Sequence, residues 1–225
     1  MCIRDRQGGL RIVDSARTAR DETFALPWGD VARVRDHHRE LRVRVAETAG
    51  PQREFVVAFR AFDDGVAFRY ELPEQPNLRD FEIVDELTEF ALAEDARAWW
   101  STATKAMPDR QEQLYSATPV SQTDTVHTPL TLQLTGGVQA VIHEADLVDY
   151  AGMYLGLVGP RTYRAALARW KDGTAVRGRT PFVTPWRTLQ LADRVEDLAP
   201  STLALRLNPP SRIADASPYR PMKYN

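Results

Sequence analysis

The sequence predicts an all-β protein built as a sandwich of sheets. In several short segments apolar and polar residues alternate with a period of two, which is typical of strands with one buried face. Turn-forming glycine, proline and aspartate separate these segments, and hardly any stretch has the longer period of a helix. We expect one large domain, because β-sandwiches reach the 225 residues of this chain.

The first part of the chain contains a clear hairpin. Residues 41–45 alternate valine or leucine with arginine, which predicts a strand with one solvated face. The apolar segment 55–62 ends at Asp63-Asp64-Gly65, and a second strand follows over 66–71. A hairpin in which Gly65 supplies a positive φ is the natural interpretation. Residues 88–92 predict a further strand, kept short by the acidic pair that follows.

A second hairpin is predicted in the middle of the chain. Residues 130–135 alternate leucine with polar residues up to Gly136-Gly137, and an apolar strand returns over 138–143. Because both segments alternate in the same way, each should bury one face.

The last third of the chain is less regular. Residues 186–191 and 203–207 predict two strands, with a single helical turn at 195–198 between them. Residues 162–170 fit one face of a helix or a strand, and periodicity alone leaves both possibilities open.

Composition excludes several classes of function. The chain has 29 lysines and arginines against 31 aspartates and glutamates, a formal charge of −2 and a pI near 6.1. This balance predicts no binding to nucleic acid or to anionic membranes. No apolar run approaches the roughly 20 residues of a membrane span. A single cysteine, Cys2, excludes an intrachain disulfide and a zinc site built from several thiolates.

The two ends of the chain differ from its body. Residues 1–6 lack the apolar core of a signal peptide and are expected to be a non-native leader. The β domain is expected over residues 7–208. Four prolines in residues 209–225 break regular structure, so this segment is predicted to be an extended linker toward a further domain.

Glu144 is the strongest candidate for a functional residue. Val138, Ala140 and Ile142 alternate with Gln139, Val141 and His143, so a strand would point Glu144 to the same face as Ile142. An ionised carboxylate on an inward face needs hydrogen-bonding neighbours, a salt bridge or a bound cation. From the residues alone, a structural salt bridge or a frayed strand end is favoured over metal ligation.

Four segments together resemble a known family. They are Phe62 to Tyr70, His143 to Leu155, Thr184-Pro185-Trp186-Arg187-Thr188-Leu189 and Leu207-Asn208-Pro209. In this order they resemble the N-terminal domain of glycoside hydrolase family 97. The resemblance covers nearly the whole chain after the leader. Each segment alone is modest evidence, but four in the right order are specific.

The resemblance implies a fold and a context. It implies a β-super-sandwich of the galactose-mutarotase type, joined in the same chain to a catalytic (β/α)8 barrel and a small C-terminal β domain. Family members resemble periplasmic or secreted α-glucosidases and α-galactosidases that act on α-linked oligosaccharides. The catalytic carboxylates would belong to the barrel, so this domain alone should be inactive. Residues 221–224 resemble the α-glucosidase branch, although Pro218 and Met222 depart from the usual pattern.

The resemblance also implies a role for Glu144. Its position matches a glutamate that joins barrel glutamates around a calcium ion. Calcium takes about six to eight oxygen ligands, so one carboxylate could only complete a site built mostly elsewhere. Asp149 and Tyr150 would support the loop that carries Glu144, or would equally cap a turn and pack an aromatic ring.

Two other functions are alternatives. The chain could be a free-standing carbohydrate-binding module, or a mutarotase-like aldose epimerase using His127 or His143 with Glu144 as acid and base. The adjacent His37 and His38 are expected at the surface.

The tryptophans could stack on sugars, but core packing is the better interpretation for most of them. Arg187, next to Trp186, is expected to be structural and could pair with an acid at a domain interface.

Overall fold

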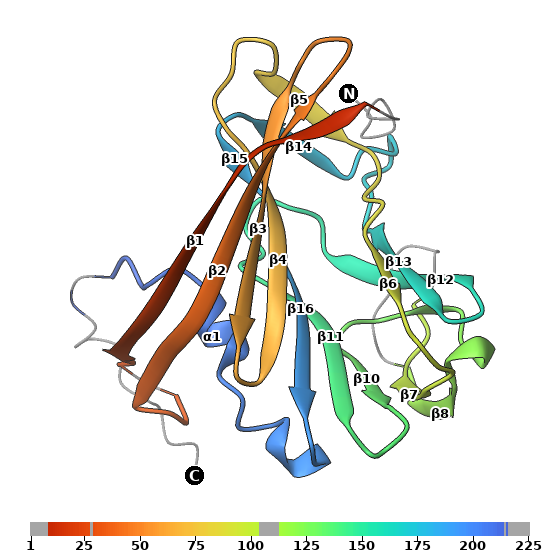
Figure 1. Ribbon diagram of the computed structural model, residues 1–225. Helices are drawn as coiled ribbons and strands as arrows, with labels where there is room; N and C mark the ends of the chain where they lie inside the picture. The colour runs from red at the N-terminus through yellow and green to blue at the C-terminus, as the bar shows by residue number, and fades with distance from the viewer. Residues whose placement is uncertain (1–8, 28, 104–112, 214, 216–225) are drawn as a thin grey trace.

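The computed structural model describes residues 9–27, 29–103, 113–213 and 215, and this part of the chain is almost entirely β (Figure 1). The strands are β1 (Leu10–Ala25), β2 (Arg33–Glu47), β3 (Glu54–Phe62), β4 (Gly65–Leu72), β5 (Asp80–Ile83), β6 (Glu89–Ala91), β7 (Arg97–Trp100), β8 (Ser116–Pro119), β9 (Thr125–Val126), β10 (Leu130–Gln133), β11 (Gln139–Ala145), β12 (Met153–Gly159), β13 (Thr162–Leu167), β14 (Val176–Arg179), β15 (Phe182–Val183) and β16 (Trp186–Ala192). The expected leader, 1–6, and most of the expected linker, 209–225, lie outside the described residues. Within the described part, no helix has the length and apolar character needed to cross a membrane.

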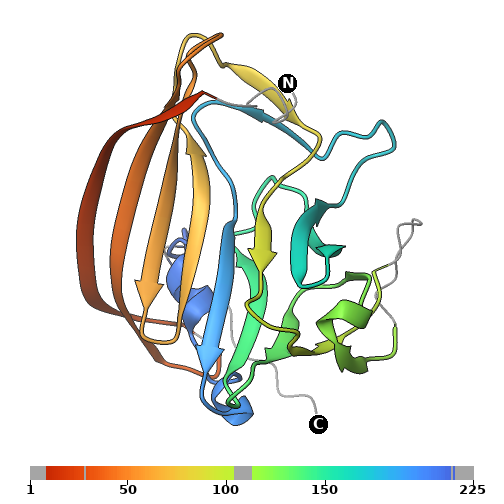
Figure 2. The ribbon, with the colours of Figure 1, turned by 45° about the vertical axis from the view of Figure 1, so that its right-hand side comes forward.

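The strands form one large sheet and two smaller ones. The large sheet has ten strands in the order β1-β2-β3-β4-β16-β11-β10-β7-β8, with β15 added beside β4. A four-stranded sheet has the order β6-β13-β12-β9, and β14 pairs with β5. In Figure 2 the long strands β1 to β4 stand at the left, and the four-stranded sheet lies to the right of β16.

The main core lies between the large sheet and the four-stranded sheet. Leu130, Leu132 and Ile142 of the large sheet pack in one buried cluster with Leu155 and Tyr163 of the smaller sheet. Each strand contributes alternate residues to this cluster, as the period of two requires. The predicted sandwich is therefore confirmed.

Both predicted hairpins are present. β3 and β4 pair through the turn at Gly65, whose φ is 158°. A side chain there would be excluded as well, because a Cβ would lie 2.5 Å from the carbonyl oxygen of Leu189. β10 and β11 pair around Gly136 and Gly137, which have φ values of 86° and 91°. These turns use the conformations that glycine adopts most easily.

The prediction of a strand at 203–207 is wrong. These residues form a short helix, α1 (Leu203–Leu207), which packs with Ala58, Ala67 and Trp186 on the outer face of the large sheet. Leu203 and Leu207 are four residues apart and therefore lie on one face of a helix. Figure 2 shows α1 behind β3 and β4.

Two further segments, at 195–198 and 162–170, can now be assigned. The expected helical turn is present as a 3-10 helix, η3 (Val195–Asp197), and a second one, η2 (Val120–Gln122), precedes β9. Of the two interpretations of residues 162–170, the strand is confirmed, since β13 pairs with both β12 and β6.

The long first strand was not predicted. β1 has 16 residues, and only Phe24 among them is partly buried. It forms the edge of the large sheet and pairs with β2 from Leu10↔Glu47 to Ala25↔Arg33. Cross-strand ion pairs such as Asp21 with Arg35 support it. A strand exposed on both faces has no apolar alternation to reveal it.

The expectation that His37 and His38 both lie at the surface is wrong for His38. His38 was expected at the surface but is 5% exposed, and its Nδ1 lies 2.7 Å from Oδ1 of Asp36. The reason is that β2 contacts α1, so the face that carries His38 is covered. His37 points the other way and is exposed, as expected.

The tryptophans differ in burial. Trp186 is a core residue, Trp170 is 53% exposed, and Trp28 lies outside the described residues.

Candidate functional site

Glu144 and Arg187 are cross-strand partners in the large sheet. Glu144 lies on β11 opposite Arg187 of β16, and the pair Ile142 and Leu189 lies two residues away on the same face. Both charged side chains therefore point into the sandwich, as the alternation predicted for Glu144. Arg187 Nη1 donates to Glu144 Oε2 at 2.6 Å, and the backbone N–H of Met153 donates to Oε1 at 3.1 Å. The inward carboxylate has a salt bridge.

Arg187 is held from its other side by Glu86. Its Nε and Nη2 donate to the two oxygens of Glu86, at 2.9 and 2.5 Å. The hydroxyl of Tyr150 also donates to Glu86, at 2.9 Å, and the Tyr150 ring centroid lies 5.5 Å from Arg187 Cζ. We call these four residues (Glu86, Glu144, Tyr150 and Arg187) the Arg187 cluster. Arg187 thus pairs with acids of its own domain.

The charges of the Arg187 cluster do not cancel. It contains one guanidinium and two carboxylates, so with both carboxylates ionised it has one negative charge in excess. Glu144 is the most exposed of the three, with 8% of its side chain accessible against 1% for Arg187 and 2% for Glu86. Of the two carboxylates, Glu144 is therefore the one nearer to solvent.

The protonation states within the cluster follow from burial and pairing. Burial by itself would raise the pKa of Glu86, but the hydrogen bonds and charge of Arg187 outweigh it and lower the pKa. Burial would likewise lower the pKa of Arg187, and its carboxylate partners raise it. Burial raises the pKa of Tyr150 well above its usual value. Near neutral pH, Glu86 is ionised, Arg187 is charged and the Tyr150 hydroxyl stays a donor.

The loop that follows Glu144, residues 146–152, has a fixed backbone path. Asp146 and Asp149 have φ values of 56° and 50°, a left-handed conformation that aspartate tolerates better than most residues. The backbone N–H of Asp146 donates to Oδ1 of Asn208 at 2.8 Å. At the tip of the loop Leu147 and Val148 are 47% and 62% exposed.

Glu144 fits the donor chemistry of a calcium ligand but could not form a site alone. A carboxylate has about four lone-pair positions, and the contacts described above use two of them. Calcium prefers such hard oxygen ligands. In the described part of the chain, no group of three or more His, Cys, Asp or Glu side chains is placed to hold a metal ion. Any metal bound by Glu144 would take most of its ligands from elsewhere.

Of the two candidate histidines, His143 points away from Glu144. His143 precedes Glu144 on β11, so its side chain points to the opposite face of the sheet. Burial lowers the pKa of His143. The ring of His127 contacts Tyr154 edge to face, with centroids 5.3 Å apart. The opposite directions of His143 and Glu144 do not support an acid and base pair made of these two residues.

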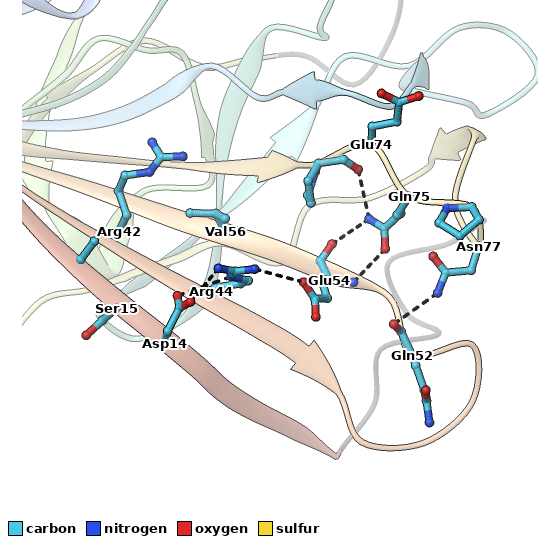
Figure 3. A pocket seen from close by; sticks show the side chains of 13 residues that line it. Asp14, Ser15, Arg42, Arg44, Gln52, Glu54, Val56, Glu74, Gln75 and Asn77 are labelled. Carbon is cyan, nitrogen blue, oxygen red and sulfur yellow. Dashed lines mark hydrogen bonds and ion pairs between the residues drawn. The ribbon is translucent and has the colours of Figure 1, made fainter.

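A separate polar cavity of about 760 Å³ lies over β1 to β3 and the segment after β4 (Figure 3). Its polar groups are largely occupied with one another. Arg44 pairs with Asp14 at 2.6 Å, and Gln75 bonds to the backbone N–H and carbonyl of Glu54. The cavity is not part of the Glu144 site.

Comparison with known proteins decides the family. The sequence model described as "Glycosyl-hydrolase 97 N-terminal" matches residues 3–210. The chain belongs to glycoside hydrolase family 97. The expected resemblance is thereby confirmed, and the match falls on the N-terminal part of family 97 enzymes.

Several family 97 proteins are similar over nearly the whole chain. A "Probable retaining alpha-galactosidase" of Streptomyces bingchenggensis is 32% identical, over 96% of this chain and 32% of its own length. A "Retaining alpha-galactosidase" of Bacteroides thetaiotaomicron is 23% identical, over 95% of this chain and 35% of its own length. The chain thus spans about a third of the curated relatives it matches.

Solved structures of family 97 confirm the fold. An enzyme from Pseudoalteromonas sp. strain K8, in complex with acarbose, is 39% identical, with a TM-score of 0.88 over 93% of this chain and 32% of that one. A variant of the same enzyme in complex with panose matches equally well.

The inward direction of Glu144 was predicted from the sequence, but its contacts with Arg187 and, through Arg187, with Glu86 were not. Glu86 lies between two short strands and has no pattern that marks it as buried. The inward direction of Arg187 could have been predicted, because Arg187, Leu189 and Leu191 are spaced two residues apart and therefore share one face of a strand. The contact between Arg187 and Glu86 joins residues 101 positions apart, which only the tertiary structure reveals.

Proposed function

We propose that this domain serves an α-glycosidase by supplying Glu144 to a calcium ion at the active site of a catalytic (β/α)8 barrel in the same protein. The observation that carries the proposal is the excess negative charge of the Arg187 cluster, which is most accessible at Glu144. A buried charge in excess is costly unless a counter-ion approaches it. Calcium would supply that counter-charge and polarise a bound substrate oxygen.

The chain path supports the proposal that a barrel lies beside Glu144. Asn208, which follows α1, is bonded to the first residue of the 146–152 loop. The chain beyond α1 therefore starts next to the loop that follows Glu144. Leu147 and Val148 at the loop tip would pack against the barrel and form part of a wall of the sugar pocket.

The relatives support an α-linked oligosaccharide as the substrate of the whole protein. The two curated relatives are described as α-galactosidases, and the solved relative was obtained with acarbose and panose. The residues at 221–224 favour α-glucosides. We propose that the whole protein acts in the periplasm or after secretion, and that this domain alone does not hydrolyse glycosides.

The test compares the whole parent protein with the isolated domain. Both are assayed on aryl α-glucosides and α-galactosides, with calcium and with a chelator. We expect calcium-dependent hydrolysis by the parent alone, and its loss in the parent carrying Glu144→Gln. Glu89→Gln, at an exposed ion pair with Arg164, is the matched control and should retain activity. Hydrolysis by the domain alone, or full activity of Glu144→Gln, would overturn the proposal.

Glycan binding by the domain itself is the second candidate function. An open groove of about 920 Å³ crosses β1 to β4 on the face opposite α1. It contains Phe59, which is 41% exposed, with the ring of Phe68 6.1 Å away between centroids. Aromatic faces of this kind can stack on pyranose rings. Titration of the isolated domain with maltooligosaccharides tests it, and Phe59→Ala should abolish any binding at this groove.

A further inference from the structure

We infer that Arg187 is a positioning residue for Glu144, and that Glu86 and Tyr150 hold Arg187 in place for this task. The inference rests on the proposed function, because it concerns how Glu144 is presented to a metal. It adds three residues to the site, from β16, from the segment before β6 and from the 146–152 loop.

The geometry of the guanidinium carries the first step. Arginine presents its N–H donors in a rigid planar fork. Glu86 engages one edge of this fork in a bidentate pair, which fixes the plane of the guanidinium. The remaining nitrogen, Nη1, is thereby aimed at Glu144 Oε2, 2.6 Å away. The direction of the Glu144 carboxylate thus depends on Glu86, although no contact joins the two glutamates directly.

Tyr150 ties this arrangement to the loop. Its hydroxyl donates to Glu86 Oε2, and its ring lies beside the Arg187 guanidinium. Tyr150 belongs to the loop that follows Glu144, so the same side chain orients the acid behind Arg187 and anchors the loop beside the carboxylate. The interactions run from Tyr150 to Glu86, from Glu86 to Arg187 and from Arg187 to Glu144.

Burial indicates that this arrangement serves more than stability. Arg187 and Glu86 are 1% and 2% exposed, and removing such charges from water is expensive. A buried ion pair adds little stability compared with apolar residues of the same volume. A fixed direction for Glu144 is what the charged arrangement provides and an apolar core would not.

The consequence for a metal is pre-organisation. Arg187 and the N–H of Met153 each bind one oxygen of Glu144, so the carboxylate is already held before any cation arrives. Ordering a free side chain would otherwise reduce the affinity. Loss of partners that orient metal ligands typically weakens metal binding by roughly 10- to 100-fold. The positive charge of Arg187 also offsets part of the negative charge of Glu144, which by itself would weaken calcium binding. We infer that the gain from fixing the direction of Glu144 is larger than this loss.

The experiment measures calcium affinity of the whole parent protein by calorimetry, independently of its activity. Arg187→Lys keeps the charge but loses the fork, and Tyr150→Phe removes only one hydroxyl. We expect calcium to bind about 10-fold more weakly or worse in Arg187→Lys, with a smaller loss in Tyr150→Phe. Combined with Glu144→Gln, Arg187→Lys should add no further loss, because it acts through Glu144.

The matched control is Arg53→Lys. Arg53 and Glu47 also form a buried pair, with side chains 3% and 5% exposed, in the turn between β2 and β3. Arg53→Lys should lower the melting temperature of the protein without changing its affinity for calcium. Calcium affinity that is unchanged or higher in Arg187→Lys and Tyr150→Phe would overturn the inference, as would equal losses in Arg53→Lys. Unchanged affinity in Glu144→Gln would instead overturn the proposed function.

Discussion

The side chain of Asn208 accepts a hydrogen bond from the backbone N–H of Asp146, with 2.8 Å between Oδ1 and N. The other end of the same amide donates to the carbonyl of Ala204, also at 2.8 Å, in addition to the bond that this carbonyl already accepts from the backbone N–H of Asn208. One side chain therefore joins the end of the helix to the loop that follows Glu144, across 62 residues of sequence.

Asn208→Ala should loosen the 146–152 loop. Both hydrogen bonds are lost, which should lower the free energy of unfolding by about 1 to 2 kcal/mol. Hydrogen exchange at the amides of Asp146 and Val148 should become faster, which mass spectrometry of loop peptides can measure. Asn77→Ala, which loses hydrogen bonds to the carbonyls of Pro51 and Gln52, is the control. Unaltered exchange in the loop would contradict the prediction.

Trp186 should be the most costly to remove of the tryptophans that the structure describes. Its side chain is 1% exposed, and the guanidinium carbons of Arg60 and Arg69 lie 4.6 and 4.4 Å from the ring centroid. Trp186→Ala should lower the free energy of unfolding by about 3 to 5 kcal/mol, and Trp186→Phe by less. Urea unfolding measures both. Trp170→Ala, at a half-exposed position, should have a much smaller effect, and equal losses would refute the assignment.

The contact of α1 with the β3–β4 turn should depend on pH through Asp64. Burial by itself would raise the pKa of Asp64, but hydrogen bonds from Arg206 and Ser201 lower it below the ordinary 3.8. Because the folded pKa is the lower one, the stabilisation is complete above pH 3.8 and is lost as the pH falls through the folded value. Melting temperatures of the original protein and of Asp64→Asn should differ at pH 6 and converge towards pH 2. A constant difference would exclude this linkage.

Tyr163 and Thr123 should act as a pair in the core. Tyr163 is fully buried, and its hydroxyl lies 2.7 Å from Oγ1 of Thr123. Tyr163→Phe should lower the free energy of unfolding by about 1 to 2 kcal/mol, since a buried polar group loses its partner. Thr123→Val should do the same. The double variant should lose less unfolding free energy than the sum of the two single variants. Strictly additive losses, measured by denaturant unfolding in a double-mutant cycle, would contradict the pairing.

Some of the fold could be predicted because its signals are local. The turns at Gly65 and Gly136-Gly137 lie between alternating segments, and each hairpin pairs residues that are close in sequence. The direction of Glu144 followed from the alternation along β11 in the same way. The family also followed from the sequence, because four short segments in the right order were enough to identify it.

Other features could not be predicted because their causes are distant. Leucine alternates with other residues over 203–207, which predicts a strand, but packing of Leu203 and Leu207 against Trp186 and Ala58 selects the helix. β1 has no buried face, so only its pairing with β2 defines it as a strand.

The sequence by itself determined the β architecture, the family and the inward direction of Glu144, since side-chain alternation and turn chemistry act over a few residues. Only the tertiary structure decided what Glu144 meets there. Arg187 is 43 residues away and Glu86 lies 101 residues from Arg187, and burial in a common interior brings them within hydrogen-bond distance. The cost of leaving a buried charge unpaired selects such partners across the fold, and no local pattern in the chain records that selection.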